Sequence, residues 1–193
     1  MLISLIKYPV TTLGPGKRIG VWTSGCKRNC PGCMSVSFQT FDKNRERTID
    51  SIVNEIKQIA SNHEVNGITI SGGEPFLQQD LIDLLKEINM LKIDDVLLYT
   101  GYKLEELNDK KEELSLIGVL VDGEYIDELN DNYPLRGSSN QNVYVLKKNL
   151  NDKYLEYVKK PRTFEIQVDD KNITVIGILP KNGHKYLKEI LNK

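Results

Sequence analysis

The chain has 193 residues, 39% of them hydrophobic, which suits a single domain with one core. Its 26 Lys and Arg are balanced by 27 Asp and Glu, so no overall field attracts nucleic acid or an anionic membrane. The apolar start, Met1–Pro9, is too short for a signal sequence and is predicted to be a strand. No apolar run approaches the ~18 residues of a membrane helix. These features predict a cytoplasmic protein with reduced thiols.

Short β-branched runs alternate with amphipathic stretches of helical period, which is typical of a parallel sheet covered by helices. Strands are predicted at Arg18–Thr23, Gly67–Ser71, Asp95–Thr100, Leu116–Val121 and Asn142–Leu146. Helices are predicted at Ile49–Ser61 after an N-cap at Thr48, and around Leu81–Ile88, Leu104–Leu107 and Tyr154–Val158. The pattern indicates an α/β fold with about five or six parallel strands, arranged as a partial, splayed βα barrel.

Beyond residue 150, the chain is predicted to form a helix, a β-hairpin and a short closing helix. The hairpin strands are Thr163–Val168 and Ile173–Leu179, joined by a polar turn at 169–172, and the closing helix is Lys185–Lys193. We expect residues 1–150 to form the core of the fold and residues 151–193 to pack on the same domain. The hairpin is suited to finishing the open barrel edge, covering a cavity or meeting a partner, and the sequence does not choose among these roles.

Unusual residues follow directly after four of the predicted strands. They are Cys26–Cys33, Gly72–Pro75, Gly101–Tyr102 and Asp122–Gly123. Loops that leave the carboxyl ends of parallel strands open on one face of the sheet, and active sites assemble there. The sequence therefore predicts that these four motifs converge.

All three cysteines of the chain lie within eight residues, as Cys26, Cys30 and Cys33. Thiolates at spacings of four and three, in a loop rich in Gly and Pro, can turn inward onto one iron–sulfur cluster. A structural site normally closes its coordination with a fourth ligand, whereas a site that does chemistry keeps one position free. Three ligands thus predict a cluster with one iron open to a small molecule.

Zinc is the alternative occupant of the cysteine loop. His63 or His184 would then supply the fourth ligand of a three-Cys, one-His site. Zinc ligands usually come in closely spaced pairs, and neither histidine is near the triad in sequence. His63 is predicted to cap a helix end, and His184 to lie in a surface turn.

The motif Gly72-Gly73-Glu74-Pro75 places two glycines where a strand ends, so that a ligand can approach the backbone. Together with the Cys-x3-Cys-x2-Cys spacing, it resembles the signature of the radical S-adenosylmethionine (AdoMet, or SAM) superfamily. Within it, the chain is most similar to the family of anaerobic ribonucleoside-triphosphate reductase activating proteins, which are glycyl-radical enzyme activases. The similarity extends over roughly residues 8–146 and includes the segments 14–16, 24–26, 30–33, 100–107, 119–123 and 136–141.

The resemblance implies a [4Fe-4S] cluster on Cys26, Cys30 and Cys33, with AdoMet at the open iron. Reductive cleavage of AdoMet at that iron yields methionine and a 5′-deoxyadenosyl radical. The residues that the resemblance places near AdoMet are Gly32 and Met34 beside the adenine or ribose, Gly72, Gly73 and Glu74 at the methionine moiety, and Tyr102 and Asn140 in the pocket lining. Glu74 is the candidate acceptor for the α-amino group. Met34 stands where the related activases often carry Tyr.

Three functions follow as hypotheses. The leading one is an activase that abstracts a hydrogen atom from a backbone glycine of a large partner, such as an anaerobic ribonucleotide reductase. The second is a stand-alone radical AdoMet enzyme that acts on a small molecule or peptide, and the third is a non-catalytic zinc or cluster-binding interaction module. Either enzyme needs an electron donor of the flavodoxin or ferredoxin type, and Lys27 and Arg28 are candidates for docking it or for favouring the reduced cluster. The alternative for both residues is a pair of solvated loop charges.

Overall fold

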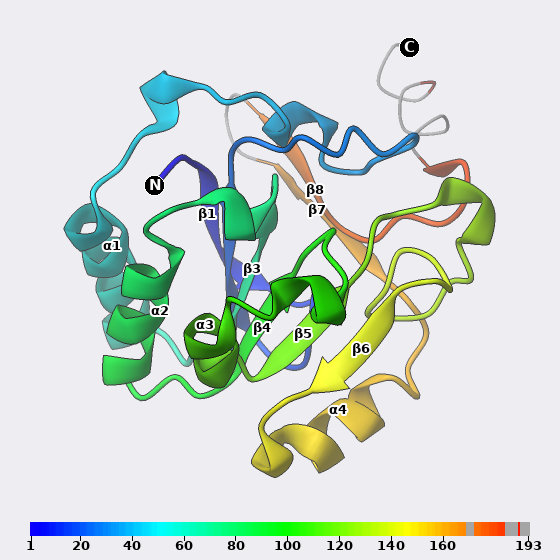
Figure 1. Ribbon diagram of the computed structural model, residues 1–193. Helices are drawn as coiled ribbons and strands as arrows, with labels where there is room; N and C mark the ends of the chain where they lie inside the picture. Colours follow the sequence, from blue (N-terminus) through cyan, green and yellow to red (C-terminus); the bar gives the residue numbers. More distant parts are fainter. Residues whose placement is uncertain (169–171, 184–188, 190–193) are drawn as a thin grey trace.

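The protein is an α/β structure built on a six-stranded sheet, as seen in the computed structural model of residues 1–168, 172–183 and 189 (Figure 1). The strands follow one another across the sheet in chain order: β1 (Ile3–Val10), β2 (Arg18–Thr23), β3 (Gly67–Gly72), β4 (Val96–Tyr99), β5 (Val119–Asp122) and β6 (Asn142–Val145). Strands β2 to β5 are parallel, and β1 and β6 run antiparallel at the two ends. The predicted α/β class is confirmed, and each strand predicted before residue 150 corresponds to one in the sheet.

The direction of β6 corrects the expectation of five or six parallel strands. A parallel neighbour requires a crossover that carries the chain back along the sheet, usually through a helix. The connection from β5 to β6 contains only a short 3-10 turn at Asp127–Leu129. The chain therefore re-enters the sheet at the end where it left, and Asp122 pairs with Asn142 at the start of an antiparallel strand.

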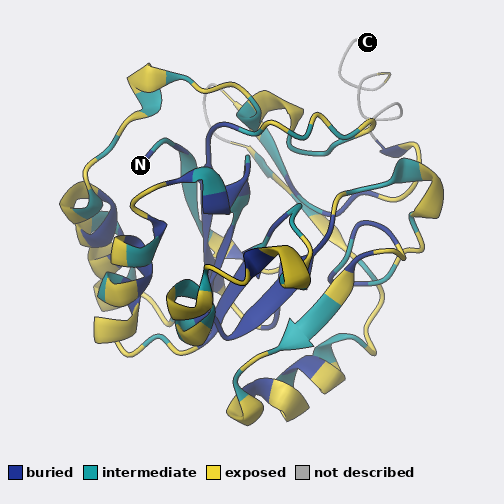
Figure 2. Ribbon diagram, viewed as in Figure 1, coloured by how far each residue is buried: buried dark blue, intermediate teal, exposed yellow. Residues whose placement is uncertain are grey.

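Helices cover one face of the sheet (Figure 1). They are α1 (Ile49–Asn62), α2 (Leu81–Met90) and α3 (Lys111–Leu116), while α4 (Asn151–Tyr157) lies near β6. Helix α1 begins as predicted, since the Thr48 side chain accepts a hydrogen bond from the Ser51 amide at 3.2 Å. Figure 2 shows that the helices bury one side against the sheet and expose the other. Within the described part of the chain, no helix is long and apolar enough to cross a membrane.

Two local predictions were wrong. Helix α3 was not expected, and Leu116, predicted to open a strand, ends this helix instead. Leu155, one of the apolar residues that indicated the helix around Tyr154–Val158 and were expected in the core, is 60% exposed, and Tyr154 is the residue of this helix that is buried. Both errors concern helices of six or seven residues, which are too short for the periodicity to be decisive.

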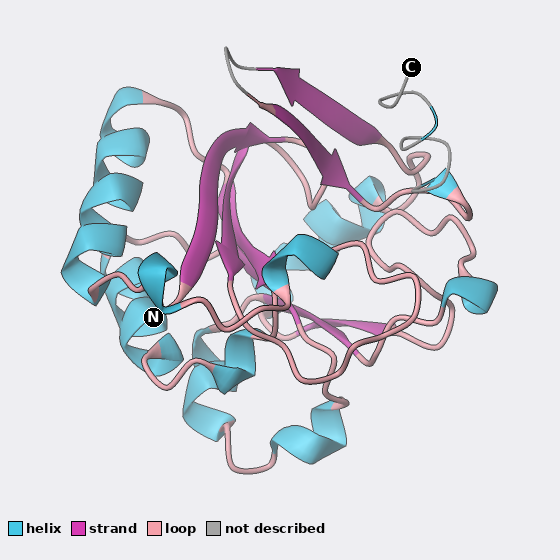
Figure 3. Ribbon diagram, turned by 90° about the horizontal axis from the view of Figure 1, so that it is seen from above, coloured by secondary structure: helices cyan, strands magenta, loops and turns pink. Residues whose placement is uncertain are grey.

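The residues after α4 form a second, two-stranded antiparallel sheet, β7 (Phe164–Val168) and β8 (Ile173–Gly177). This confirms the predicted hairpin. Figure 3 shows that it stands opposite the curved sheet, on the side away from α1 and α2. The hairpin turn at 169–171 lies outside the described residues, as does the predicted closing helix at Lys185–Lys193 apart from Glu189.

A buried network of ion pairs and hydrogen bonds lies at the end of the sheet where the parallel strands begin. Arg18, at the start of β2, is fully buried and donates to the Asp95 carboxylate at 2.9 Å and to the Thr69 hydroxyl at 2.7 Å. Tyr154 and Lys153 of α4 donate to the same carboxylate, at 2.6 and 2.5 Å. The network therefore ties α4 to three neighbouring strands.

Candidate functional site

The cysteine loop leaves the carboxyl end of β2 and returns beside its own start. The amides of Gly25 and Cys26 donate to the carbonyls of Phe38 and Gln39, each at 2.8 Å, and the Ser24 hydroxyl donates to the Thr40 carbonyl at 2.7 Å. These bonds fix both ends of the loop that carries the three thiols. A loop closed in this way holds its side chains in a defined arrangement without help from regular secondary structure.

Backbone amides point at two of the sulfur atoms. The amides of Arg28 and Ser35, each two residues after a cysteine, donate to the Sγ atoms of Cys26 and Cys33 at 3.5 and 3.4 Å. Burial raises the pKa of Cys30 and of Cys33, and the neighbouring cysteines raise both pKa values further. Cys30 and Cys33 therefore lie close enough to other thiols of the loop to interact with their charge. Amide donors of this kind tune the potential of a sulfur-ligated cluster.

The donor set fits an iron–sulfur cluster. Three thiols share one loop, and in a cube each thiol would ligate a different iron atom, so the sulfurs need not converge on a single point. Among the described residues, no three side chains of His, Cys, Asp or Glu are gathered closely enough to hold one metal ion. His63 ends α1 as predicted, with its ring stacked on Tyr8 at 4.9 Å, and His184 lies outside the described residues.

The Gly72–Pro75 motif lies directly against the start of the cysteine loop. The amides of Gly73 and Glu74 donate to the carbonyls of Thr23 and Gly25, at 2.8 and 2.9 Å. A Cβ on Gly73 would lie 2.3 Å from the Gly25 carbonyl oxygen, and one on Gly72 would lie 2.5 Å from the Thr23 backbone. Both glycines are thus required by the close approach of two backbones, which joins the second motif to the first.

We expect Gly73→Ala to push the second motif away from the cysteine loop, because the new methyl group meets backbone atoms that cannot rotate aside. The variant should lose about 1–3 kcal/mol of unfolding free energy, as overpacked sites do. It should also bind less iron per chain after anaerobic reconstitution. Iron content and urea unfolding test this. Asn54→Ala, at an exposed position of α1 far from the cysteine loop, is the control. Full iron content in the Gly73 variant would contradict the steric argument.

Glu74 connects the second motif to the third. Its carboxylate is 1% exposed and accepts hydrogen bonds from the Gly101 amide at 2.7 Å, the Thr100 hydroxyl at 2.8 Å and the Phe76 amide at 3.1 Å. Burial raises the pKa of Glu74, although these hydrogen bonds oppose the increase. Both carboxylate oxygens accept hydrogen bonds from the protein. The bonds from Thr100 and Gly101 hold the loop after β4 in place.

Arg28 and Tyr102 form the next contact between motifs. The Arg28 guanidinium lies over the Tyr102 ring, 4.5 Å from its centre, and near the carboxylates of Glu106 and Glu124 at 3.6 and 3.9 Å. Arg28 therefore ties the cysteine loop to the loops after β4 and β5. Lys27, by contrast, is exposed.

The fourth motif, Asp122–Gly123, is also hydrogen-bonded to the loop after β4. One oxygen of Asp122 accepts from the Leu104 amide at 2.8 Å, and the other accepts from the backbone and side-chain amides of Asn142, each at 3.1 Å. The Gly123 amide donates to the Tyr102 carbonyl at 2.9 Å. All four motifs thus meet at one end of the sheet, which confirms the predicted convergence.

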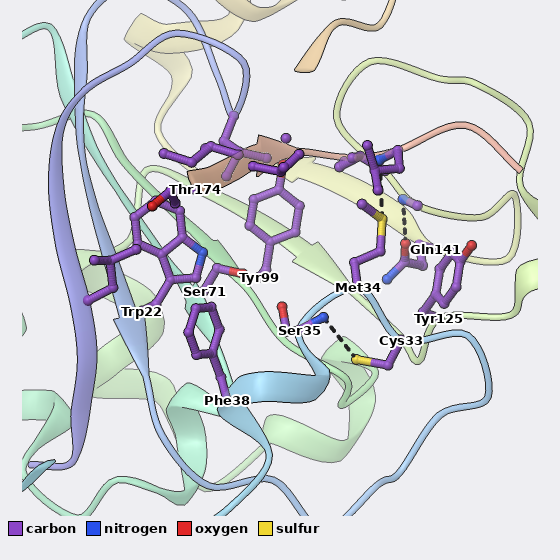
Figure 4. Close-up of a pocket in the computed structure, with 18 residues that line it drawn as sticks. Trp22, Cys33, Met34, Ser35, Phe38, Ser71, Tyr99, Tyr125, Gln141 and Thr174 are labelled. Carbon is purple, nitrogen blue, oxygen red and sulfur yellow. Dashed lines mark hydrogen bonds between the residues drawn. The ribbon is translucent and has the colours of Figure 1, made fainter. Parts of the chain in front are cut away.

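A cavity of about 390 Å³ opens beside the cysteine loop, between the sheet and the hairpin (Figure 4). It is lined by Cys33 and Met34, by inward-facing strand residues and by the segment 174–179 of the hairpin side. Most of the lining is apolar. The sulfur of Met34 accepts a hydrogen bond from the Leu179 amide at 3.3 Å, so the cysteine loop and the hairpin side contact each other at this cavity.

The other predicted site residues lie around this cavity and not in its lining. Glycines 72 and 73 and Glu74 form the junction described above, Gly32 faces Asp127, and Tyr102 lies under Arg28. Asn140 is exposed, and its side chain donates to the Glu124 carbonyl at 2.9 Å. The neighbouring Gln141 is the residue of that segment that lines the cavity.

Sequence reasoning missed the polar and aromatic residues that line the cavity from the strands. Trp22, Ser71 and Tyr99 stand side by side near the ends of β2, β3 and β4 and point inward (Figure 4). The Tyr99 hydroxyl is buried and has no hydrogen-bond partner among the described residues. These three residues could have been predicted from the alternation of side chains along each strand. The last inward-facing positions of three adjacent strands line the same cavity.

Comparison with known proteins shows the family. The profile described as "4Fe-4S single cluster domain" matches residues 12–144. The anaerobic ribonucleoside-triphosphate reductase-activating protein of Escherichia coli K12 is 38% identical over 153 residues, which cover 72% of this chain and 96% of that protein. The protein of the same name from Vibrio cholerae is 33% identical, covering 71% of this chain and 94% of its own.

A more distant relative points the same way. A putative glycyl-radical enzyme activating enzyme of Methanocaldococcus jannaschii is 28% identical over 155 residues, covering 79% of this chain and 54% of that protein. The matched family region contains the cysteine loop, the glycine motif and the two loops that hold them together. The chain therefore belongs to the family of anaerobic ribonucleoside-triphosphate reductase-activating proteins, which are activating enzymes of the radical AdoMet type with a 4Fe-4S domain.

Proposed function

We propose that this protein installs a glycyl radical on an anaerobic ribonucleotide reductase, using AdoMet bound at its [4Fe-4S] cluster. One observation carries the proposal. The thiols of Cys26, Cys30 and Cys33 sit in a loop that is hydrogen-bonded to the Gly73–Glu74 backbone, and a cavity opens beside Cys33. The sheet that supports them is, in this proposal, the partial barrel of the radical AdoMet enzymes, closed on one side by the hairpin.

Each motif has a distinct task. The three cysteines would hold the cluster, and Gly72 and Gly73 let the second motif pack directly against the backbone of the cysteine loop, with the methionine moiety of AdoMet proposed to lie beside this junction. When bound, the cluster and AdoMet would supply the chemistry, which is one-electron reductive cleavage of a carbon–sulfur bond coupled to removal of a hydrogen atom from glycine. Glu74 positions the loop after β4, and its Oε2 atom, which accepts a hydrogen bond from the Gly101 amide, is the proposed acceptor for the α-amino group of AdoMet.

The cavity supplies the environment that radical chemistry needs. Met34, Trp22 and Phe38 give it apolar walls beside Cys33. Such walls limit the access of water to the reacting atoms. Gly32 and Met34 are proposed to face the adenosine part of AdoMet, with Tyr102 and Asn140 on the outer rim.

The electron donor is proposed to be a flavodoxin or ferredoxin. Of the two basic residues in the cysteine loop, Arg28 is already engaged with Tyr102, Glu106 and Glu124, so it is poorly placed to bind a second protein. Lys27 is exposed and remains the candidate contact for an acidic donor. We also propose that residues 151–193 belong to the same domain as residues 1–150, since Tyr154 joins the buried network of Arg18.

The test is to mix anaerobically reconstituted protein with AdoMet, dithionite and the catalytic subunit of the anaerobic reductase from the same organism. We expect 5′-deoxyadenosine and a glycyl doublet in the electron paramagnetic resonance spectrum. Deoxyadenosine without any radical on the reductase would instead favour a stand-alone enzyme. A colourless protein that holds zinc and forms no deoxyadenosine would contradict both.

A further inference from the structure

Four of the side chains that line the cavity beside Cys33 carry polar groups without a hydrogen-bond partner among the described residues. These groups are the Tyr99 hydroxyl, which is buried, the Ser71 hydroxyl, the indole N–H of Trp22 and the Thr174 hydroxyl. Folded proteins rarely bury a polar group without a partner, because the group has then lost its bonds to water and gained none. The four groups therefore point to a ligand that supplies the missing partners.

The sheet and the hairpin both contribute to this set of groups. Trp22 and Ser71 are register partners on the parallel strands β2 and β3, and Tyr99 is the last residue of the neighbouring strand β4. Adjacent strands lie about 4.8 Å apart, so these three side chains form a row across the strand ends. Thr174 lines the cavity from β8 of the hairpin (Figure 4). A ligand in the cavity can therefore meet polar groups from both walls.

The lining of the cavity excludes a charged ligand. None of the 18 described residues that line it is Lys, Arg, His, Asp or Glu. A phosphate, or the ammonium and carboxylate groups at the amino-acid end of AdoMet, would be buried there without an opposite charge, which is costly. An apolar lining with a few polar groups is typical of a site for a neutral ligand that those groups orient.

A peptide backbone has the chemistry that this lining requires. It is neutral, and each residue offers one N–H donor and one carbonyl acceptor. The indole of Trp22 can only donate, whereas the hydroxyls of Ser71 and Tyr99 can donate and accept, so the set can bind carbonyl and amide groups together. A segment held in this way lies beside Cys33, which also lines the cavity.

We propose that the cavity holds the glycine-bearing loop of the partner enzyme as a neutral peptide segment, and that Trp22, Ser71, Tyr99 and Thr174 hydrogen-bond its backbone. This inference rests on the proposed function and assigns the part of the site that takes the protein substrate. AdoMet is left to the cysteine loop, Met34 and the glycine motif. The hairpin, which lies outside the family match at residues 12–144, thereby forms one wall of the substrate site.

The experiment uses the double variant Ser71→Ala, Tyr99→Phe, which removes two hydroxyls and little else. Reconstituted protein with saturating AdoMet and no reductant is titrated with the catalytic subunit of the anaerobic reductase in a calorimeter, so that binding is measured without turnover. We expect the affinity for the reductase to fall by about tenfold, because each lost hydrogen bond costs a few-fold. With dithionite added, the KM for the reductase in glycyl radical formation should rise by a similar factor. The affinity for AdoMet, measured by equilibrium dialysis, should change by less than about twofold.

Three further variants separate binding from folding. Tyr99→Phe alone should not lower the free energy of unfolding, because its hydroxyl has no partner to lose, yet it should weaken binding of the reductase by a few-fold. Thr174→Val tests the hairpin wall in the same way and serves should the double variant fail to fold. The matched control is Ser61→Ala, Tyr144→Phe, which removes the same two kinds of hydroxyl outside the cavity lining and should bind as wild type does.

Two results would overturn the inference. Unchanged affinity and KM for the reductase in the double variant would show that the polar groups of the cavity do not hold the substrate loop. An affinity for AdoMet that falls as much as the affinity for the reductase would assign these groups to the adenosine of AdoMet. A wild-type protein that forms no glycyl radical on the reductase would instead count against the proposed function, whatever the variants do.

Discussion

Replacing Cys30 with alanine is expected to abolish both the cluster and AdoMet cleavage. Cys30 lies midway in a loop whose ends are fixed by backbone hydrogen bonds, and the chain has no cysteine beyond the other two ligands, Cys26 and Cys33, that could replace it. Loss of an outer-sphere contact to a metal site commonly costs 10–100-fold, and loss of a ligand should cost more. Visible absorbance near 400 nm, iron content and deoxyadenosine should therefore all fall to background.

Lys27→Ala is the matched control, because Lys27 is exposed in the same loop. It should retain the cluster and deoxyadenosine formation with dithionite. A Cys30→Ala protein that kept its iron and its turnover would mean that the three thiols do not form the proposed site.

Replacing Asp95 with alanine is expected to cost about 3–5 kcal/mol of unfolding free energy, measured by urea denaturation at pH 7. The substitution leaves the Arg18 guanidinium fully buried without its counter-charge, and it removes the acceptor for Tyr154 and Lys153. Asp94→Ala is the control, since the Asp94 side chain is 64% exposed and only approaches Lys147 at 3.8 Å. A similar, small loss in both variants would contradict the assigned role of the network.

The contribution of Asp95 to the free energy of unfolding should depend on pH. Burial raises its pKa, but the charge of Arg18 and the hydrogen bonds from Arg18, Lys153 and Tyr154 outweigh burial and hold the pKa below its usual value. A carboxyl group with a depressed pKa stabilises the fold fully above the unfolded pKa, about 3.9. The difference in stability between wild type and Asp95→Ala should therefore shrink as pH falls below about 4.

Much of the central sheet could be predicted from the sequence. Strand β2 has the predicted bounds, Arg18–Thr23, because its residues are all buried and bounded by a glycine-rich segment and the cysteine loop. Helix α1 was marked by Thr48 and a regular apolar face. The convergence of the four motifs also followed from the sequence, since parallel strands send their carboxyl ends to one side.

The features that escaped prediction depend on contacts between distant segments. The residues of β6, Asn142–Val145, do not themselves indicate whether the strand is parallel or antiparallel to β5. The antiparallel direction follows from the lack of a crossover helix between β5 and β6. The sequence also indicated a hairpin but could not place it over the cavity. That position rests on contacts with distant segments: Ile176 is buried in one apolar cluster with Val10 and Trp22, and Glu165 and Gln167 form hydrogen bonds with Thr11 and Pro9. The engagement of Arg28 by Tyr102 likewise joins residues more than 70 positions apart.

The alternative functions differ in what they require of the site. A stand-alone enzyme needs a cavity that holds its whole substrate, whereas an activase needs only the tip of a partner loop. The cavity measures about 390 Å³, and none of the described residues that line it is Lys, Arg, His, Asp or Glu. This combination favours the neutral tip of a peptide loop as the substrate.

The most direct measurement follows the hydrogen atom itself. The reductase is labelled with α-deuterated glycine and mixed with reconstituted protein, AdoMet and dithionite, and the deoxyadenosine is analysed by mass spectrometry. The account predicts deuterium in deoxyadenosine, together with a radical on the reductase in similar amount. Deoxyadenosine that forms without deuterium, while the reductase carries no radical, would contradict it.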